Sequence, residues 1–468
     1  MHLLPRSLVS ALLAAGLAAC AVGPEYHRPD APVPPAFKEA DGWVQARPSD
    51  AADRGPWWTV FGDPALSALV AQVEVSNQNV AAATAAYAQA RALVREQRAA
   101  LFPVVNLGGD ASRAGGSGSS RSGSTYQVSI GGSWEPDVWG RLGNASRSAA
   151  AGADASAADL ASARLSAQGE LVTNYLALRQ TDAQAALLAT TIAGYQRVLQ
   201  ITQNRYNAAI AARTDLLQAQ TQLANAQAEA LGLGRQRAQL EHAMAVLLGR
   251  APADFSQPVA AWQPRVPEVP AGLPSELLQR RPDIAAAERR VAAANAQVGV
   301  AQAAFYPSLN LSASYGLGAS RVSELFSTSA GAWSLGLSAA QVLFNAGATR
   351  ARVDGAEASW QESVARYRQT VLAAFQQVED QLAAIRVLAQ QQDLRRQASE
   401  AADQAETQVL NRYNAGQISF AEVVAAQVTA LSARRALVQV QADRQTAAAA
   451  LIQALGGGWQ ATTAPPPG

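Results

Sequence analysis

The stretch LFPVVNL at Leu101–Leu107 occurs again in altered form as FYPSLNL at Phe305–Leu311, 204 residues further along the chain. An alanine-rich run precedes each copy, and the proline in each copy ends that helix because proline cannot continue the helical hydrogen-bond ladder. Apolar and small polar residues then alternate, which is the pattern of a β-strand with two different faces. The motif therefore predicts, twice in one chain, a helix followed directly by a strand.

The similarity between the two halves continues beyond this motif. The segment RYNA occurs at Arg205–Ala208 and again at Arg412–Ala415, now at an offset of 207, and Leu248-Gly249 is matched by Leu455-Gly456 at the same offset. Each repeat is predicted to run helix, strand, loop, strand, long helix, tight turn, helix. The expected segments are a signal peptide at 1–19, a proline-rich tail at 20–56, a first repeat at 57–250, a connector at 251–282, a second repeat at 283–456 and a C-terminal tail at 457–468.

The four predicted strands form two hairpins, at about 103–135 and about 307–343. In the first hairpin Tyr126, Val128, Ile130 and Trp134 share one face and small polar residues share the other. A soluble hairpin on a core is the ordinary interpretation of such strands. Here the polar faces are small and the aromatic residues lie near strand ends, which favours an outer-membrane barrel.

The helices are unusually long. From Gly140 to about Tyr206 there is no proline, and about 65 residues at 1.5 Å each would span roughly 100 Å. Apolar residues recur at spacings of three and four, as in coiled coils. A soluble helical bundle is the competing interpretation.

The N-terminus has the features of a targeting segment. Arg6 precedes a short apolar run at Leu8–Ala19, which is too short to cross a membrane. The run ends in Leu17-Ala18-Ala19-Cys20, which resembles the bacterial lipoprotein processing box, so Cys20 is the expected lipid anchor. Ala21 then implies sorting to the outer membrane. The alternative is an ordinary signal peptide with an incidental cysteine.

The composition argues against several classes of function. Lysine and arginine number 37 and acidic residues 36, so no basic excess indicates a nucleic-acid partner. One cysteine, three histidines and two methionines give no metal-ligand spacing, and no catalytic set emerges. We therefore expect no enzyme activity, no cofactor and no metal site.

Four strands cannot close into a barrel, and an open sheet edge is not tolerated in lipid. Copies of the chain must therefore pool their strands. Eight strands leave an interior filled by side chains, so a pore requires at least three copies. Three copies would give twelve strands and four would give sixteen, and the strand count does not choose between them.

These features together resemble the TolC/OprM outer-membrane factors, especially the lipoprotein branch that serves drug-efflux pumps. The motifs that carry the resemblance span the chain: Gly23-Pro24-Glu25-Tyr26, Trp57–Leu66 (WWTVFGDPAL), Trp139–Leu142 (WGRL), Arg280–Ile284 (RRPDI) and Tyr413–Gly416 (YNAG). The resemblance implies a mixed fold, mostly long α-helices plus four β-strands per chain in a shared transmembrane β-barrel, with an internal two-fold repeat. It also implies a homotrimer, a periplasmic adaptor protein, an inner-membrane transporter of the RND type and a passive role in export through the outer membrane of a Gram-negative bacterium.

The resemblance also assigns candidate sites at the tight turns of 207–212 and 414–419. In the family these tips meet the adaptor and close the resting channel, so the expected adaptor contacts are Asn207, Ala208, Ala209, Asn414, Ala415 and Gly416. The expected gate residues are Glu422, Asp215, Arg412 and Tyr413. Gly416 suits a left-handed turn, whereas Ala209 leaves the geometry of the first turn open.

Each gate residue also has an ordinary interpretation. Ala425 stands where relatives carry aspartate, so an acidic ring would hold one glutamate per copy. A solvated surface position is the alternative for Glu422 and Asp215, and ordinary helix packing is the alternative for Arg412 and Tyr413. For the whole chain, the alternatives are a porin working alone, against which the tunnel helices argue, and a lipid-tethered coiled-coil scaffold, against which the strands argue.

Overall fold

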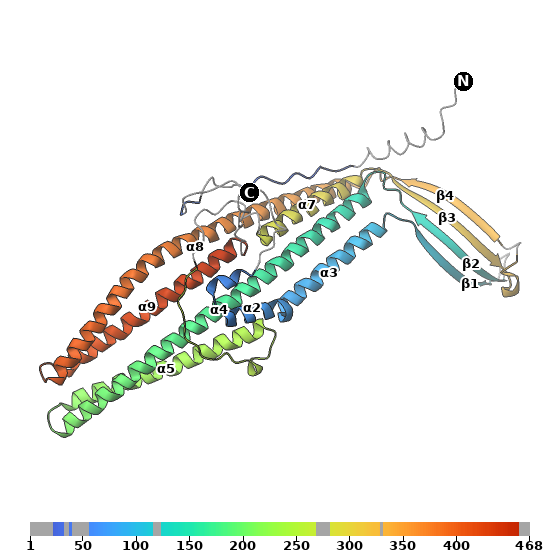
Figure 1. Cartoon of the computed structure of the whole chain (residues 1–468). Coiled ribbons are helices and arrows are strands. Elements are labelled where there is room, and N and C mark those ends of the chain that lie inside the picture. The colour runs from blue at the N-terminus through green and yellow to red at the C-terminus, as the bar shows by residue number, and fades with distance from the viewer. Residues whose placement is uncertain are drawn as a thin grey trace, which may run out of the picture. The chain divides into compact units, whose positions relative to one another are not determined.

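The computed structural model describes residues 22–31, 37–39, 56–115, 123–267, 281–327 and 331–457. Cys20 and most of the C-terminal tail lie outside these residues. The described elements, labelled as in Figure 1, are η1 Trp57–Phe61, α2 Pro64–Ser76, α3 Gln78–Ala99, β1 Val104–Ala114, β2 Gly123–Trp134, α4 Arg141–Asn207, α5 Arg213–Leu247, η2 Pro252–Asp254, α7 Pro282–Ala303, β3 Ser308–Ala319, η3 Val322–Glu324, β4 Gly331–Ala340, α8 Ala348–Asn414 and α9 Phe420–Ala454.

The element order confirms the predicted repeat. Helices α4 and α8 each have 67 residues, and α5 and α9 each have 35. The start of α4 at Arg141 and of α8 at Ala348 preserves the offset of 207. The proline of each repeated motif falls one residue before a strand, at β1 and β3, as the sequence predicts.

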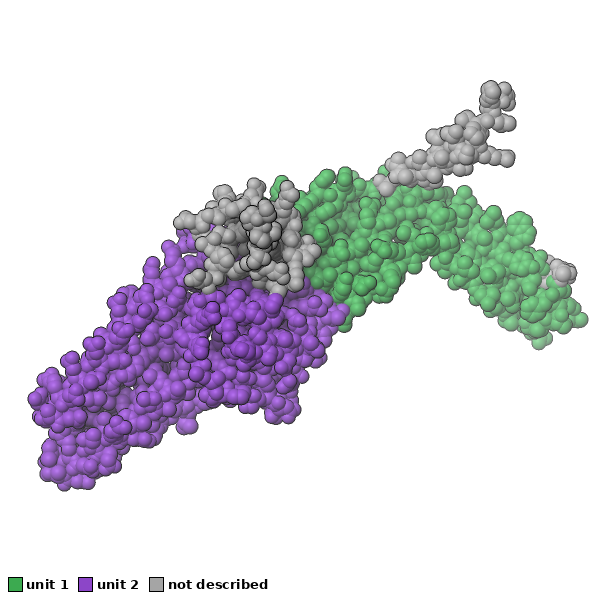
Figure 2. Space-filling view, viewed as in Figure 1, with its two compact units in different colours: residues 1–31, 85–158, 286–369 green, residues 32–84, 159–285, 370–468 purple. Residues whose placement is uncertain are grey.

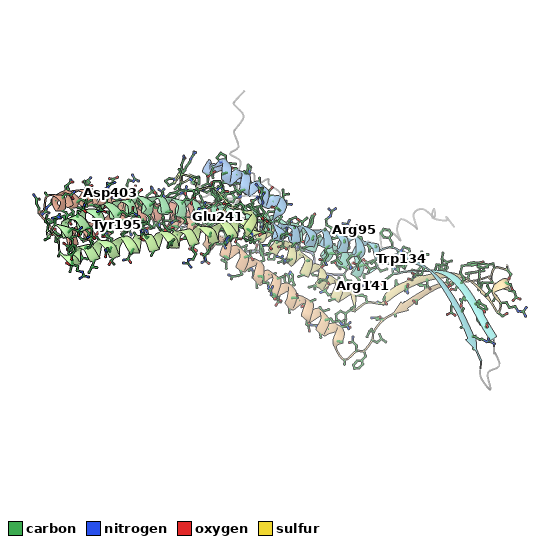
Figure 3. The ribbon with its side chains drawn as sticks, turned by 90° about the horizontal axis from the view of Figure 1, so that it is seen from below. Arg95, Trp134, Arg141, Tyr195, Glu241 and Asp403 are labelled. Atoms are coloured by element: carbon green, nitrogen blue, oxygen red, sulfur yellow. The ribbon has the colours of Figure 1, made fainter. Side chains whose placement is uncertain are left out.

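The chain divides into two compact units, coloured separately in Figure 2. Unit 1 comprises residues 1–31, 85–158 and 286–369. It holds a four-stranded antiparallel sheet in the order β1-β2-β3-β4, together with most of α7 and parts of α3, α4 and α8. Trp134 ends strand β2, and Arg141 begins helix α4 shortly after it (Figure 3).

Unit 2 comprises residues 32–84, 159–285 and 370–468. It contains α2, α5, α9 and the remaining parts of α4 and α8. The hairpins α4–α5 and α8–α9 bring their two tight turns to the same end of this unit (Figure 1). Its core includes a cluster in which Leu188 and Tyr195 of α4 pack with Ala226 and Leu233 of α5.

Among the described helices, none combines the length and the apolar character that a membrane crossing needs.

Candidate functional site: a two-faced sheet and two helical tips

The sheet of unit 1 carries different chemistry on its two faces. Residues directly opposite each other in neighbouring strands lie on the same face. One such row joins Leu107, Ile130, Tyr315 and Trp333 across all four strands. Leu107 and Trp333 are 79% and 78% exposed in the single chain. The sheet therefore presents a continuous apolar face, which confirms the predicted alternation.

The opposite face is lined by small and polar residues. A neighbouring row joins Asn106, Gly131, Ser314 and Ser334, and the hydroxyls of the two serines lie 2.8 Å apart. The aromatic side chains of the paired strands, such as Tyr315 and Trp333, lie on the other face. A sheet with one apolar exposed face and one polar face suits a wall between lipid and water.

Aromatic side chains anchor the ends of the strands. The indole Nε1 of Trp134 donates to the carbonyl oxygen of Leu101 at 2.9 Å, and that of Trp139 donates to the carbonyl oxygen of Pro307 at 2.7 Å. The Trp139 ring also stacks on Tyr306 with 4.8 Å between ring centroids. Each indole thus combines a large apolar surface with a satisfied polar group, the arrangement favoured at membrane interfaces.

The first helical tip closes with a residue in the left-handed region. Ala209 has a φ of 58°. Its backbone N–H donates to the carbonyl of Tyr206 at 2.9 Å, and the N–H of Ile210 donates to that of Arg205 at 2.8 Å. These two bonds are the Schellman pattern that ends a helix with a left-handed residue. Ala209 therefore adopts the conformation that the sequence had left open.

The second tip has the same backbone with a residue better suited to it. Gly416 has a φ of 74°, its N–H donates to the carbonyl of Tyr413 at 2.9 Å, and the N–H of Gln417 donates to that of Arg412 at 2.9 Å. The next helices begin alike as well: the backbone is at φ −73°, ψ 154° at Ala212 and at φ −73°, ψ 158° at Ser419. The tips are the same structure built twice.

The two predicted gate residues on α8 have different environments. Tyr413 is 4% exposed and packs on Phe420 with 5.6 Å between ring centroids. The Arg205 guanidinium lies 4.6 Å from the centre of the Tyr413 ring, and its Nη1 donates to the Tyr413 carbonyl at 3.1 Å. Tyr413 therefore joins α8 to α4 within one chain. Arg412 is exposed.

The two acidic gate candidates occupy equivalent positions near the start of α9 and α5. Glu422 is exposed, and its Oε1 lies 3.4 Å from both the backbone nitrogen and the hydroxyl of Ser419. This is a capping box, in which the glutamate helps the residue before the helix to satisfy free backbone groups. Asp215 is half-buried in the first turn of α5, where Ala212 offers no side-chain cap. A gate role for either residue stays a prediction.

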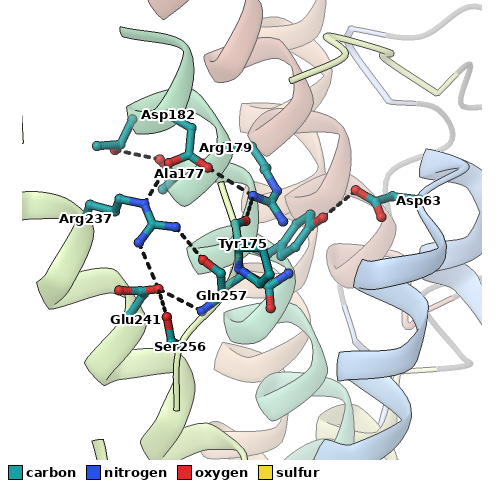
Figure 4. A network of polar contacts seen from close by, with 11 residues as sticks. Asp63, Tyr175, Ala177, Arg179, Asp182, Arg237, Glu241, Ser256 and Gln257 are labelled. Carbon is teal, nitrogen blue, oxygen red and sulfur yellow. Dashed lines mark hydrogen bonds and ion pairs between the residues drawn. The ribbon is translucent and has the colours of Figure 1, made fainter. Parts of the chain in front are cut away.

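A buried ion network in unit 2 was not found by sequence reasoning (Figure 4). Asp182 accepts from Arg179 at 3.0 Å and from Arg237 at 2.8 Å, and Arg237 also pairs with Glu241 at 2.9 Å. The guanidinium groups further donate to the carbonyls of Pro258 and Gln257. These contacts tie α4 and α5 to the start of the connector, so the network holds together the end of the first repeat.

Tyr175, close to that network, holds helix α2. Its hydroxyl donates to Asp63 at 2.5 Å, and Asp63 also accepts from the first backbone N–H groups of α2. Burial and then this hydrogen bond raise the pKa of Tyr175 to about 12. No spacing in the sequence pairs Asp63 with Tyr175, since only tertiary packing brings them together.

The described residues include no group of three histidine, cysteine, aspartate or glutamate side chains arranged to hold a metal ion.

Comparison with known proteins supports one assignment for this architecture. A family model described as "Outer membrane efflux protein" matches residues 69–250 and 273–457, one segment in each repeat. The chain is 33% identical to the probable efflux pump outer membrane protein TtgC of Pseudomonas putida, over 98% of this chain and 97% of the relative. It is 34% identical to the pyoverdine export outer membrane protein OpmQ of Pseudomonas aeruginosa, with 97% of each covered.

Solved structures agree with these relatives. The outer-membrane channel OprN has a TM-score of 0.85 at 31% identity, covering 94% of this chain and 100% of the channel. The open-state MtrE outer membrane channel of Neisseria gonorrhoeae has a TM-score of 0.82 at 28% identity, covering 94% and 98%. Both are similar to this chain over both repeats.

Proposed function

The chain belongs to the outer membrane efflux protein family, and from this premise we propose that three copies pool their sheets into one closed barrel that opens into a periplasmic tunnel. It is an outer-membrane channel subunit of an efflux pump. In the proposed assembly each copy supplies four of twelve strands, and the tunnel is built from the long helices. The channel itself is a passive conduit without enzyme activity, and a partner protein supplies the energy for transport.

The observation that carries this proposal is the two-faced sheet with two open edges. Among the described strands of one chain, β1 and β4 each pair with a single neighbour, so each leaves an edge of unpaired backbone groups. The apolar face would lie against lipid, where unsatisfied backbone groups are costly. Pairing β4 of one copy with β1 of the next satisfies both edges at once.

The internal repeat supplies an expected register for that junction. Strand β3 repeats β1 at an offset of 204, and β4 repeats β2 at an offset of 207. These offsets turn the Leu107–Ile130 pair of the first hairpin into the Leu311–Leu337 pair that is observed in the second. At the β2–β3 junction Gly132 faces Ala313. The counterpart of Gly132 in β4 is Ala339 and the counterpart of Ala313 in β1 is Gly109, so we expect Ala339 of one copy opposite Gly109 of the next.

A pair of cysteines tests the assembly. Gly109→Cys combined with Ala339→Cys should give disulfide-linked dimers and trimers on a denaturing gel. The control, Gly132→Cys with Ala313→Cys, should link within one chain and leave monomers. Native mass spectrometry of the detergent-solubilised protein should show three copies. A stable monomer with full secondary structure would refute the shared barrel.

The partners are a periplasmic adaptor and an inner-membrane transporter of the RND type. The relatives are named as efflux pump outer membrane proteins, and the tip residues Asn207, Ala208, Ala209, Asn414, Ala415 and Gly416 form two exposed turns of equal geometry. Placing Trp at Ala208 or Ala415 should weaken adaptor capture in a co-purification without changing the trimer. Undiminished capture by both variants would remove the tips from the adaptor interface.

The cargo is a small molecule chosen upstream of this channel. Relatives of similar identity are named for antibiotic, toluene and pyoverdine export, so related channels serve chemically unlike compounds. Identifying the transporter that co-purifies with the chain would determine the compound class.

Cys20 is the lipid anchor in this proposal, because it is the lone cysteine and directly follows the apolar leader. Mass spectrometry of the mature N-terminus should detect an acylated Cys20. An unacylated mature N-terminus at another residue would overturn the assignment.

A further inference from the structure

Within one chain, an arginine of the first repeat holds a tyrosine of the second. The guanidinium of Arg205 lies 4.6 Å from the ring centre of Tyr413 and donates to its carbonyl oxygen at 3.1 Å. An arginine over an aromatic face within about 6 Å is attracted by the ring quadrupole. This contact lies one turn from the tips, where α4 meets α8, and it leaves Tyr413 only 4% exposed.

Each repeat carries both halves of this contact, because RYNA stands at both tips. The counterpart of Arg205 is Arg412, and the counterpart of Tyr413 is Tyr206. Tyr206 is 38% exposed. Arg412 is exposed too, and within the described part of the chain it makes no side-chain hydrogen bond or ion pair. One chain therefore uses the arginine of its first repeat and the tyrosine of its second, and leaves the other two unused.

Arg412 and Tyr206, which make no such contact within one chain, could pair with each other between the copies of a ring. In the trimer of the proposed function, on which this inference rests, the second repeat of one copy stands beside the first repeat of the next. A head-to-tail contact of this kind repeats around a closed ring. Such an arrangement brings Arg412 of one copy to Tyr206 of its neighbour.

We propose that Arg412 of one copy binds the ring of Tyr206 of the next copy, reproducing between copies the contact that Arg205 and Tyr413 make within each chain. The two tips have the same backbone geometry, so the contact seen within the chain is a suitable template for the contact between copies. Their turns share the same hydrogen bonds and a left-handed residue at the same place, and the helices after them begin with nearly the same backbone angles.

The contact between copies is the weaker of the two. Within the chain, the hydroxyls of Tyr413 and Thr202 lie 3.5 Å apart, and Phe420 packs against the Tyr413 ring. The counterpart of Thr202 is Val409, which has no hydroxyl, and the counterpart of Phe420 is the exposed Arg213. Tyr206 therefore lacks both of the supports that fix Tyr413. It follows that the tips part between copies before they part within a chain.

Cross-linking of the full-length protein in detergent, without adaptor, tests the contact directly. Arg412→Cys combined with Tyr206→Cys is treated with a short bismaleimide and run on a denaturing gel. We expect covalent dimers and trimers, and none from either single variant. The matched control, Arg205→Cys with Tyr413→Cys, should link within the chain and stay monomeric.

Channel recording gives a second reading that does not depend on cysteines. Because separation between copies widens the tip end of the tube, Tyr206→Leu and Arg412→Gln should each raise the conductance of the trimer in planar bilayers at least twofold. Their combination should add nothing further, since both remove one contact. Tyr206→Phe keeps the ring and should behave as the parent.

The outcomes separate this inference from the function on which it rests. If native mass spectrometry shows trimers and the control pair links, but the Arg412/Tyr206 pair does not link between copies, the contact is absent and the inference is wrong while the channel assignment stands. Additive conductance changes in the double variant would also overturn it. Loss of the trimer in the parent protein would instead refute the proposed assembly.

Discussion

The first tip, 207–212, and the second tip, 414–419, follow the same path with different residues. The left-handed position holds Ala209 in one and Gly416 in the other, with φ of 58° and 74°. The residue before the next helix is Ala212 in one and Ser419 in the other, and only Ser419 takes part in a capping box. By local chemistry the second turn is the better formed.

The difference extends to how each tip is packed. Tyr413 and Phe420 belong to a buried cluster with Ala219 and Val423, whereas Tyr206 is partly exposed. The second tip is thus stabilised both by its own residues and by its neighbours in the chain. The first tip keeps the same backbone with fewer supports, which shows that the shape of the turn is not set by glycine and serine alone.

The largest expected effect comes from the packing of the second tip. Phe420 is 1% exposed, and truncating a buried phenylalanine costs about 3–5 kcal/mol. Phe420→Ala should therefore raise the hydrogen exchange of backbone amides in the first turns of α9 by several orders of magnitude. Its counterpart Arg213 is exposed, so Arg213→Ala should change exchange in α5 little. Equal effects at the two tips would contradict the difference in packing.

Exchanging alanine and glycine at the left-handed position should change the stability of the two tips in opposite directions. An L-residue with a side chain pays about 1–2 kcal/mol in the left-handed region. Ala209→Gly relieves this strain but also makes the open chain more flexible, so the free energy of local opening at the first tip should rise by about 1 kcal/mol. Gly416→Ala should lower the free energy of local opening at the second tip by a similar amount. Among the described residues of one chain, and apart from its two neighbours in sequence, no residue comes within 4 Å of where a side chain at position 416 would begin, so the substitution measures strain and not a clash. Hydrogen exchange of the turn amides reports both, and changes of the same sign would exclude this explanation.

Exchanging the caps should reduce the contrast between the tips. Ser419→Ala removes a side chain that accepts from the start of α9, at a cost of about 1 kcal/mol. Ala212→Ser puts the same group before α5, where the backbone angles already match, and should slow exchange there. If Ala212→Ser has no effect, the first tip does not open by fraying of α5.

The smallest expected effect on stability, with a clear effect on function, belongs to Glu422. Glutamine keeps the capping geometry, so Glu422→Gln should change tip stability by less than about 0.5 kcal/mol. If the three Glu422 carboxylates of the proposed trimer line its pore, removing their charge should weaken cation selectivity in planar bilayers. Asp215→Asn tests the acidic gate candidate of the first tip by the same two measurements. Unchanged selectivity and conductance in Glu422→Gln would return Glu422 to a solvated capping role.

Much of this fold follows from local sequence. The repeated proline motif, the alternation in the strands and the long proline-free runs predict the four strands, the long helices and their order, because each depends on residues close together in the chain. The sheet register confirms that Leu107, Ile130, Tyr315 and Trp333 share a face. The left-handed conformation of Ala209 was left open by the sequence, and only the structure decides it.

The candidate site was predictable only in part. The tips were located from RYNA and the residues after it. The capping role of Glu422 has a local signal, because Ser419 and Glu422 stand at the Ser-x-x-Glu spacing of a capping box. The partner of Tyr413 and the pairing of Arg237 with Asp182 have none. Arg205 and Tyr413 are 208 positions apart, and Arg237 and Asp182 are 55 apart, so no short-range pattern records either pair.

The sequence by itself determined the duplicated order of helices and strands, the two faces of the sheet and the position of both turns, since these depend on backbone propensities and on periodicity within each segment. Only the tertiary structure decided which copy of a repeated residue is buried. The tripeptide Arg-Tyr-Asn is the same at both tips, yet Tyr413 is covered by Arg205 and Tyr206 is not covered within the chain. The reason is physical: burial is a property of what lies beside a residue in space, and in the described part of the chain Arg205 of the first repeat lies over Tyr413 while Tyr206 keeps 38% of its surface exposed.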